Sequence, residues 1–223
     1  MSKVIVAIDG PAGSGKSSVS KQVAREFGFA YLDTGAAYRA LAWATLNGLS
    51  FERLAANDFE TDFEYSISTD PDNFWVRVGE HDVTEAIRTS LISETVSSVA
   101  ALSHVRDFMK RLTKKIVDEC PYDGAIVEGR DITTVVFPDA QSRLLLTASE
   151  EVRLQRRSKE LSADSASAVV NQVSKRDETD SKIVDFMNAA VGVTLIDSSN
   201  LDFDQTVSVM IAQIKADLKA SAQ

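Results

Sequence analysis

The sequence predicts an α/β fold built on a parallel sheet of five strands that is flanked by helices. Two observations lead to this prediction: short apolar runs of strand length recur along the chain, and segments with helical periodicity separate them. A third observation is a break in that alternation, because residues 63–78 show a period of two. This period predicts an antiparallel hairpin, which parallel units do not need, and it therefore indicates an inserted subdomain.

The predicted strands of the sheet are apolar runs, as is typical of parallel strands buried on both faces. They cover residues 4–8, 29–33, 124–128, 144–146 and 193–197. Four of them end in or are followed by an acid, namely Asp9, Asp33, Glu128 and Asp197. One such acid alone is as often a helix cap or a turn former as a functional residue. Because ligands of parallel sheets gather beyond the carboxyl ends of the strands, four acids there favour a functional site.

Segments in which apolar residues recur every three or four positions predict the helices. The first ends at Gly28, a typical helix stop, and Thr34 is expected to cap the next helix. Ser50 is expected to cap a short helical segment, and Asp202 with Gln205 to form a reciprocal cap on the last helix. Further helices are predicted around residues 92–99 and 105–116, after Ser149, and around residues 169–173.

The 223 residues are predicted to form a single domain with two insertions. Its core comprises residues 1–61, 124–148 and 183–223. Residues 62–123 form the first insertion, which contains the hairpin and two helices. Residues 149–182 form a helical lid, whose helices are separated by a stretch of mostly Ser and Ala.

The composition excludes several classes of protein. A net charge of −9 disfavours a general nucleic-acid or anionic-membrane binder, whose surface would be basic. The single cysteine, Cys120, excludes an intrachain disulfide, and one thiol with two histidines falls short of a zinc site. No segment has the apolar length of a signal or membrane span. We therefore expect a cytoplasmic protein that binds neither nucleic acid nor membranes. We also expect a monomer, although none of these observations bears on the oligomeric state.

Residues 10–17 read GPAGSGKS and fit the pattern G-x-x-x-x-G-K-[ST] of a phosphate-binding loop, or P-loop. The predicted strand before the loop and helix after it are the context that this function requires, so a chance match is disfavoured. Lys16 is expected to reach the outer phosphates of a nucleoside triphosphate, and Ser17 to ligate Mg²⁺. Lys16→Ala is expected to lose most of the activity and retain the fold, because an exposed lysine of this loop contributes little to packing.

Six arginines lie in or beside predicted loops and helix starts, and they indicate an acceptor that also carries a phosphate. Phosphoryl transfer needs preorganised positive donors, and planar guanidinium groups suit phosphate oxygens. A phosphate acceptor with a second pKa near ~6 is largely dianionic at neutral pH and needs no catalytic base. The six are Arg39, Arg106, Arg130, Arg153, Arg157 and Arg176.

Three stretches together resemble the bacterial cytidylate (CMP) kinases of the P-loop nucleoside monophosphate kinase superfamily. They are residues 10–17, residues 32–39 (LDTGAAYR) and residues 128–140 (EGRDITTVVFPDA). The resemblance implies a P-loop kinase sheet with a hairpin-containing subdomain for the acceptor, ATP as co-substrate with Mg²⁺, and phosphorylation of CMP and dCMP. Related kinases that act on hydroxyl groups tend to have a second acid where this chain has Gly35.

The resemblance also assigns roles to individual residues. For the ATP phosphates it implies Gly10, Pro11, Ala12, Gly13, Ser14, Gly15, Lys16, Ser17 and Ser18, with Ser17 on the metal. Arg153 would lie against adenine, and Lys16, Arg130 and Arg157 would be catalytic. For the acceptor it implies Thr34, Arg39 and Arg130 on the phosphate, Ser97, Arg106 and Asp131 on cytosine, and Arg176 and Asp180 on the sugar.

The chain departs from the family pattern at three positions. It has Ile183 where the family usually has an arginine that contacts the nucleotide, Thr133 where a glycine is usual, and Glu128 where Asp is also found. Two alternatives remain open: another P-loop kinase that acts on UMP or a small phosphorylated metabolite, and a nucleotide-binding switch protein with slow turnover. The absence of an N-K-x-D motif disfavours a GTPase switch.

Overall fold

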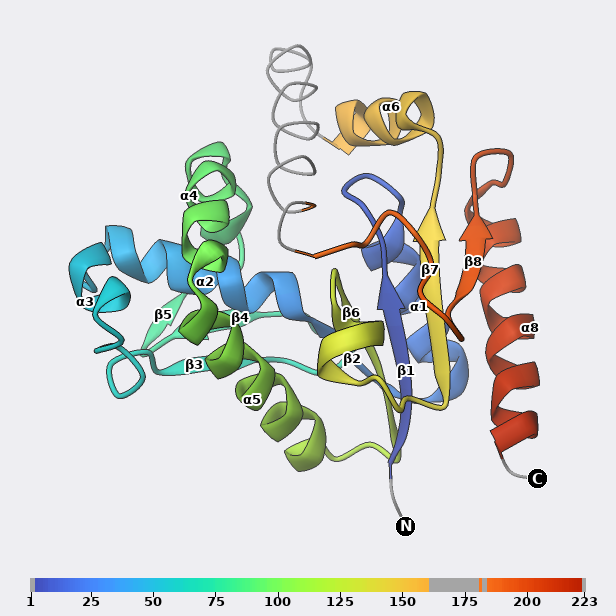
Figure 1. The fold of residues 1–223 in the computed structure, drawn as a ribbon, viewed down its shortest axis with the longest axis horizontal. Helices are drawn as coiled ribbons and strands as arrows, with labels where there is room; N and C mark the ends of the chain where they lie inside the picture. The colour runs from blue at the N-terminus through green and yellow to red at the C-terminus, as the bar shows by residue number, and fades with distance from the viewer. Residues whose placement is uncertain (1–2, 161–180, 182–183, 222–223) are drawn as a thin grey trace. The chain divides into compact units, whose positions relative to one another are not determined.

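The computed structural model describes residues 3–160, 181 and 184–221 (Figure 1). The predicted helix around residues 169–173 and the residues Arg176, Asp180 and Ile183 lie outside that description. The chain divides into two compact units. The first comprises Met1–Tyr31 and Pro121–Gln223, and the second comprises Leu32–Cys120.

A five-stranded sheet forms the centre of the first unit, in the order β2-β6-β1-β7-β8 (Figure 1). Strand β1 pairs in parallel with β6 and β7, and β7 pairs in parallel with β8. The prediction of a parallel five-stranded sheet is therefore confirmed. The bounds are β1 Val4–Asp9, β2 Ala30–Asp33, β6 Gly124–Gly129, β7 Ser142–Thr147 and β8 Thr194–Asp197.

The middle strands are buried because their side chains are apolar on both faces. Val6, Ala7 and Ile8 of β1 are 0 % exposed, and the neighbouring strands β6 and β7 are buried in the same way. The register places Asp9 beside Gly129 and Leu145, so β1, β6 and β7 end at the same edge of the sheet. Polar residues that follow these strands are thereby brought together.

Helices α1 Lys16–Phe27 and α8 Phe203–Ser221 pack against each other, α1 against β6 and α8 against β7. The reciprocal cap predicted for α8 is confirmed: the backbone N–H of Gln205 donates to Asp202 Oδ1 at 2.8 Å, and that of Asp202 donates to Gln205 Oε1 at 3.0 Å. Helix α6 Glu150–Glu160 follows β7. A π-helical turn, η2 Ile132–Val136, follows β6 and was not predicted.

The second unit combines helices with a small antiparallel sheet of order β3-β4-β5, in which β3 and β4 confirm the predicted hairpin. Helix α2 packs against α4, α5, β4 and η1. The functional division into a core, an insertion over residues 62–123 and a lid over residues 149–182 stays a prediction. The bounds are α2 Thr34–Leu46, α3 Phe51–Ala55, β3 Tyr65–Ile67, β4 Val76–Val78, β5 His81–Asp82, η1 Ala86–Arg88, α4 Ser90–Ala101 and α5 Ser103–Glu119.

The caps of two helices in this unit compare differently with the predictions. Ser50 caps α3 as predicted, because its hydroxyl accepts from the N–H of Arg53 at 3.3 Å. The prediction that Thr34 caps α2 was wrong: Asp33 is the cap, and its Oδ1 accepts from the N–H of Ala36 at 3.1 Å. Strand β2 leads into α2 without a loop, so the last strand residue takes the capping position. Among the described residues, no helix is long and apolar enough to cross a membrane.

Candidate active site

The P-loop joins the end of β1 to the start of α1, and close packing around it requires glycine. Gly13 has φ 76°, and a Cβ atom there would lie 2.6 Å from the carbonyl oxygen of Arg153. Gly15, with φ 85°, is the N-cap of α1 and has no side chain to bond the first turn. The N–H groups of that turn and the positive end of the helix dipole therefore face the loop, as an anion site needs.

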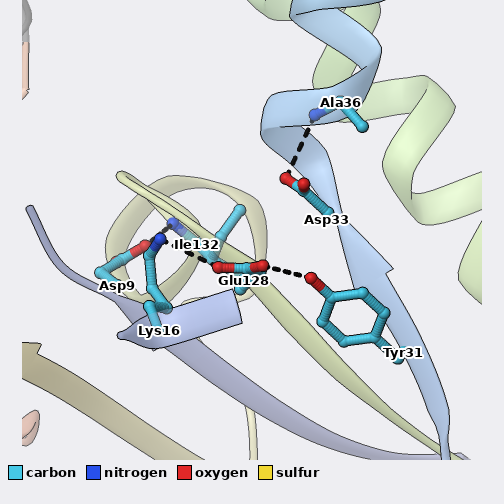
Figure 2. Close-up of polar contacts among 7 residues, drawn as sticks. All are labelled: Asp9, Lys16, Tyr31, Asp33, Ala36, Glu128 and Ile132. Atoms are coloured by element: carbon cyan, nitrogen blue, oxygen red, sulfur yellow. Dashed lines mark hydrogen bonds and ion pairs between the residues drawn. The ribbon is translucent and has the colours of Figure 1, made fainter. Parts of the chain in front are cut away.

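Lys16 is held by a buried carboxylate at the end of the neighbouring strand (Figure 2). Its Nζ lies 2.9 Å from Glu128 Oε2, and the two side chains are 15 % and 1 % exposed. The Tyr31 hydroxyl donates to Glu128 Oε1, and the Ser17 side chain also hydrogen-bonds to this carboxyl. The expectation of an open, exposed Lys16 was therefore wrong, because strand β6 places an acid directly beside it.

The environment of Glu128 favours its ionised form. Burial by itself raises the pKa of this carboxyl. The Lys16 ammonium and the hydrogen bonds from Tyr31, Ser17 and Lys16 outweigh that effect and lower the pKa of Glu128 below its ordinary value. An ionised carboxylate therefore holds the Lys16 ammonium in a fixed position beside the P-loop.

A second buried acid, Asp9, holds the turn that follows β6. Its Oδ1 accepts from the N–H of Ile132 at 2.9 Å, which is drawn in Figure 2, and its Oδ2 accepts from the N–H of Thr133 at 2.8 Å. The Thr133 hydroxyl donates to Oδ2 as well, at 2.6 Å. Burial raises the pKa of Asp9, and the bonds from Thr133 and Ile132 counteract this rise.

The turn held by Asp9 directly follows Arg130 and Asp131. The backbone carbonyl of Asp131 accepts from the N–H groups of Val135 and Val136 at 2.8 and 3.1 Å, which closes the π-helical turn. The guanidinium carbon of Arg130 lies 4.3 Å from the ring centroid of Phe186, on the segment before β8. Arg130 is thus placed at the carboxyl end of β6, next to the strand that leads into the P-loop.

Two arginines of α6 bind the P-loop backbone. Arg153 is 6 % exposed, and its Nη1 donates to the carbonyl of Ala12 at 2.9 Å. Arg156 Nη1 donates to the carbonyl of Ser14 at 3.0 Å and to Ser198 Oγ at 2.9 Å. Its Nη2 donates to the carbonyls of Ser198 and Leu201 at 2.9 and 3.2 Å. The P-loop, α6 and the β8–α8 connection are thereby joined.

The candidate acceptor residues of the second unit lie on three of its helices. Thr34 and Arg39 are on α2, Ser97 is on α4 and Arg106 is on α5. Arg106 Nη1 donates to the carbonyls of Ala100 and Ala101, both at 2.9 Å, which are the last residues of α4. This guanidinium therefore fixes the junction between α4 and α5.

Comparison with known proteins identifies the family. The family model for cytidylate kinase matches residues 6–216. A cytidylate kinase of Cutibacterium acnes is 38 % identical over 98 % of this chain and 99 % of its own length. Those of Rhodococcus opacus and Mycobacterium leprae are 39 % and 37 % identical, covering 94 % and 96 % of this chain and 94 % and 97 % of their own lengths.

The chain belongs to the cytidylate kinase family.

The resemblance stated from the three sequence stretches is thereby confirmed. Within this cytidylate kinase family member, the first unit brings Lys16, Ser17 and Glu128 together and places Arg130 at the end of the adjacent strand. The binding roles of these residues, and of those on α2, α4 and α5, stay predictions. Arg176 and Asp180 lie outside the described residues, and of Arg157 only the backbone, in α6, is described.

Three features of the site were not found from the sequence. Arg156 was given no role, although it lies three positions after Arg153 and so on the same helix face. Phe186 belongs to no motif, so nothing in the sequence indicated its contact with Arg130. Tyr31 was assigned only to a strand, and no local pattern shows that its hydroxyl reaches Glu128.

Proposed function

We propose that the protein catalyses the ATP-dependent phosphorylation of CMP and dCMP, giving ADP with CDP or dCDP. The observation that carries the proposal is the family match over residues 6–216, together with relatives that are named cytidylate kinase and align along nearly their whole length. The relation of the P-loop to Arg130 supports it, because both lie at the same edge of the sheet.

In this mechanism the acceptor phosphate is the nucleophile. One of its oxygens bonds to the γ-phosphorus of ATP, and the bond from that phosphorus to the β–γ bridging oxygen breaks, so that the electron pair leaves with ADP. Because the dianionic acceptor needs no general base, the protein contributes position and positive charge. Lys16 stabilises charge on the outer phosphates, and Arg130 holds the acceptor phosphate.

The side chains beside the P-loop fit Mg²⁺. The Ser17 hydroxyl and the Glu128 carboxylate hydrogen-bond to each other, and Mg²⁺ prefers such hard oxygen ligands. Ser17 would hold the ion, with Glu128 beside it. An ion held there would supply positive charge that neutralises the phosphate oxygens.

A coupled assay that measures ADP formation with CMP, dCMP, UMP and AMP tests the proposal. CMP and dCMP are expected to be the preferred acceptors, and faster turnover of UMP or AMP would overturn the substrate assignment. Strong ATP binding without transfer to any monophosphate would instead favour a switch protein. Size-exclusion chromatography with light scattering tests the further proposal of a monomer, and cell fractionation tests that of a cytoplasmic location.

A further inference from the structure

The guanidinium of Arg130 lies over a buried aromatic ring outside every motif of the chain. Its central carbon is 4.3 Å from the centroid of Phe186, a distance at which cation–π attraction is strong. Phe186 is only 1 % exposed, so the contact is largely removed from water. A desolvated cation–π contact is stronger than one on the surface.

The segment around Phe186 has its own internal bonds. The Asp185 carboxylate accepts from the N–H groups of Met187 and Asn188 at 3.1 and 3.0 Å, and from the side-chain amide of Asn188 at 3.2 Å. These bonds lower the pKa of Asp185, so the turn keeps its charged cap at neutral pH. The backbone on either side of Phe186 is thus held in a turn, and the ring has a defined position.

Stacking and phosphate binding use different parts of a guanidinium. The central carbon of Arg130 lies over the ring of Phe186. A stacked ring contacts the flat face of a guanidinium, whereas the N–H bonds that recognise phosphate lie in its plane. Phe186 can therefore restrict the rotamers of Arg130 without competing for its donors. A side chain restricted before binding loses less conformational entropy when the ligand arrives.

We propose that Phe186 is a positioning residue that presents the Arg130 guanidinium to the acceptor phosphate. This rests on the proposed function, in which Arg130 binds that phosphate. Phe186 acts through Arg130 and does not itself touch either nucleotide. Phe186 follows the predicted lid and belongs to the predicted core. A residue of the core would therefore set the orientation of an arginine that binds the acceptor.

Steady-state kinetics of Phe186→Leu and Phe186→Tyr, with CMP and ATP varied separately, test the proposal. Phe186→Leu is expected to raise the KM for CMP up to about tenfold, with the KM for ATP unchanged, because Arg130 would then lose its rotamer freedom only when CMP binds. Phe186→Tyr keeps the ring and should restore the KM for CMP. Should Phe186→Leu not fold, Phe186→Met supplies the non-aromatic comparison.

Phe59→Leu is the matched control, since Phe59 is also 1 % exposed and its ring contacts Phe108 and His104 but no arginine in the described residues. An unchanged KM for CMP in Phe186→Leu, or an equal rise in Phe59→Leu, would overturn the proposal.

A double-mutant cycle separates this inference from the proposed function, because it measures urea unfolding and requires no activity. The cycle compares the wild type, Phe186→Leu, Arg130→Gln and the double variant. We expect the free energies of unfolding to be non-additive, because the two side chains are in contact. Additive effects would reject the contact, whereas an enzyme inactive on every monophosphate with an intact coupling would reject only the proposed function.

Discussion

The two units hold their charged site residues in different ways. In the first unit, Lys16, Asp9 and Arg156 bond to groups that are distant in the sequence and brought near by the sheet. In the second unit, Asp33 and Arg106 bond to backbone groups within one or two helical turns. Substitutions in the first unit should therefore change stability and catalysis together, whereas those in the second should affect them separately.

The largest effect is expected for Lys16→Met. Loss of the ammonium should reduce kcat at least about 10²-fold, because one preorganised charge near a developing negative charge is removed. It also leaves Glu128 buried without its counter-ion, which should cost on the order of 3 kcal/mol in unfolding free energy. Coupled assays and urea titrations measure both losses.

Glu128→Gln in the Lys16→Met background provides the sharper version of this experiment. It should recover much of the lost stability and none of the activity. Lys21→Met on the same helix is the control, and the coupling assigned to Lys16 would be refuted if that variant lost as much of both.

Asp9→Asn is expected to have the next largest effect. An amide at this position places an N–H₂ group against donors that now share two carboxylate oxygens, so roughly 1–3 kcal/mol of stability should be lost. The displaced turn should also lower kcat/KM for CMP. Thr133→Val removes the hydroxyl bond but keeps the β-branched side chain, and it should cost about 1 kcal/mol, whereas Thr133→Ser keeps the bond. Equal effects of Thr133→Val and Thr133→Ser would contradict this ordering.

Arg106→Gln tests the second unit. Its loss removes two charge-assisted bonds to the end of α4, which should lower stability by no more than about 1 kcal/mol. If Arg106 also contacts the acceptor base, the KM for CMP should rise about tenfold while kcat and the KM for ATP change little. A large drop in stability together with kcat would show that the two units do not differ as described.

The smallest effect concerns pH, and its sign differs between the two buried acids. Because folding lowers the pKa of Glu128, this group adds stability at pH values above its ordinary pKa. That stability is lost as the pH falls through the pKa of the folded state. The raised pKa of Asp9 has the opposite sign: the folded state binds a proton more readily, so stability from this group increases as the pH falls. In urea titrations between about pH 3.5 and 7, the free energy of unfolding of Glu128→Gln should decrease less steeply with falling pH than that of the wild type. For Asp9→Asn it should decrease more steeply, and the same change of slope in both variants would contradict the assignment.

Much of the fold could be predicted from the sequence because its determinants are local. The buried strands are apolar runs, the P-loop is a continuous motif, and the cap formed by Asp202 and Gln205 spans four residues. The order β2-β6-β1-β7-β8 follows from none of these, since it depends on which strands pair across long connections.

The parts of the site that were missed depend on contacts across the fold. The turn η2 exists because Asp9, at the end of another strand, takes up the N–H groups of Ile132 and Thr133. Lys16 was expected to be exposed because the sequence does not show which acid lies beside it. Thr34 was expected to cap α2, but the strand leads directly into the helix, and Asp33 as its last residue takes the capping position.

The bonds of Arg153 and Arg156 also bear on where α6 can bend. Their guanidinium groups attach the first two turns of that helix to the carbonyls of Ala12 and Ser14, and Arg156 attaches it to Ser198 and Leu201 as well. These turns therefore belong mechanically to the phosphate loop and move with it as one body. The described start of the predicted lid, as far as Arg156, is therefore fixed both to the phosphate loop and to the β8–α8 connection.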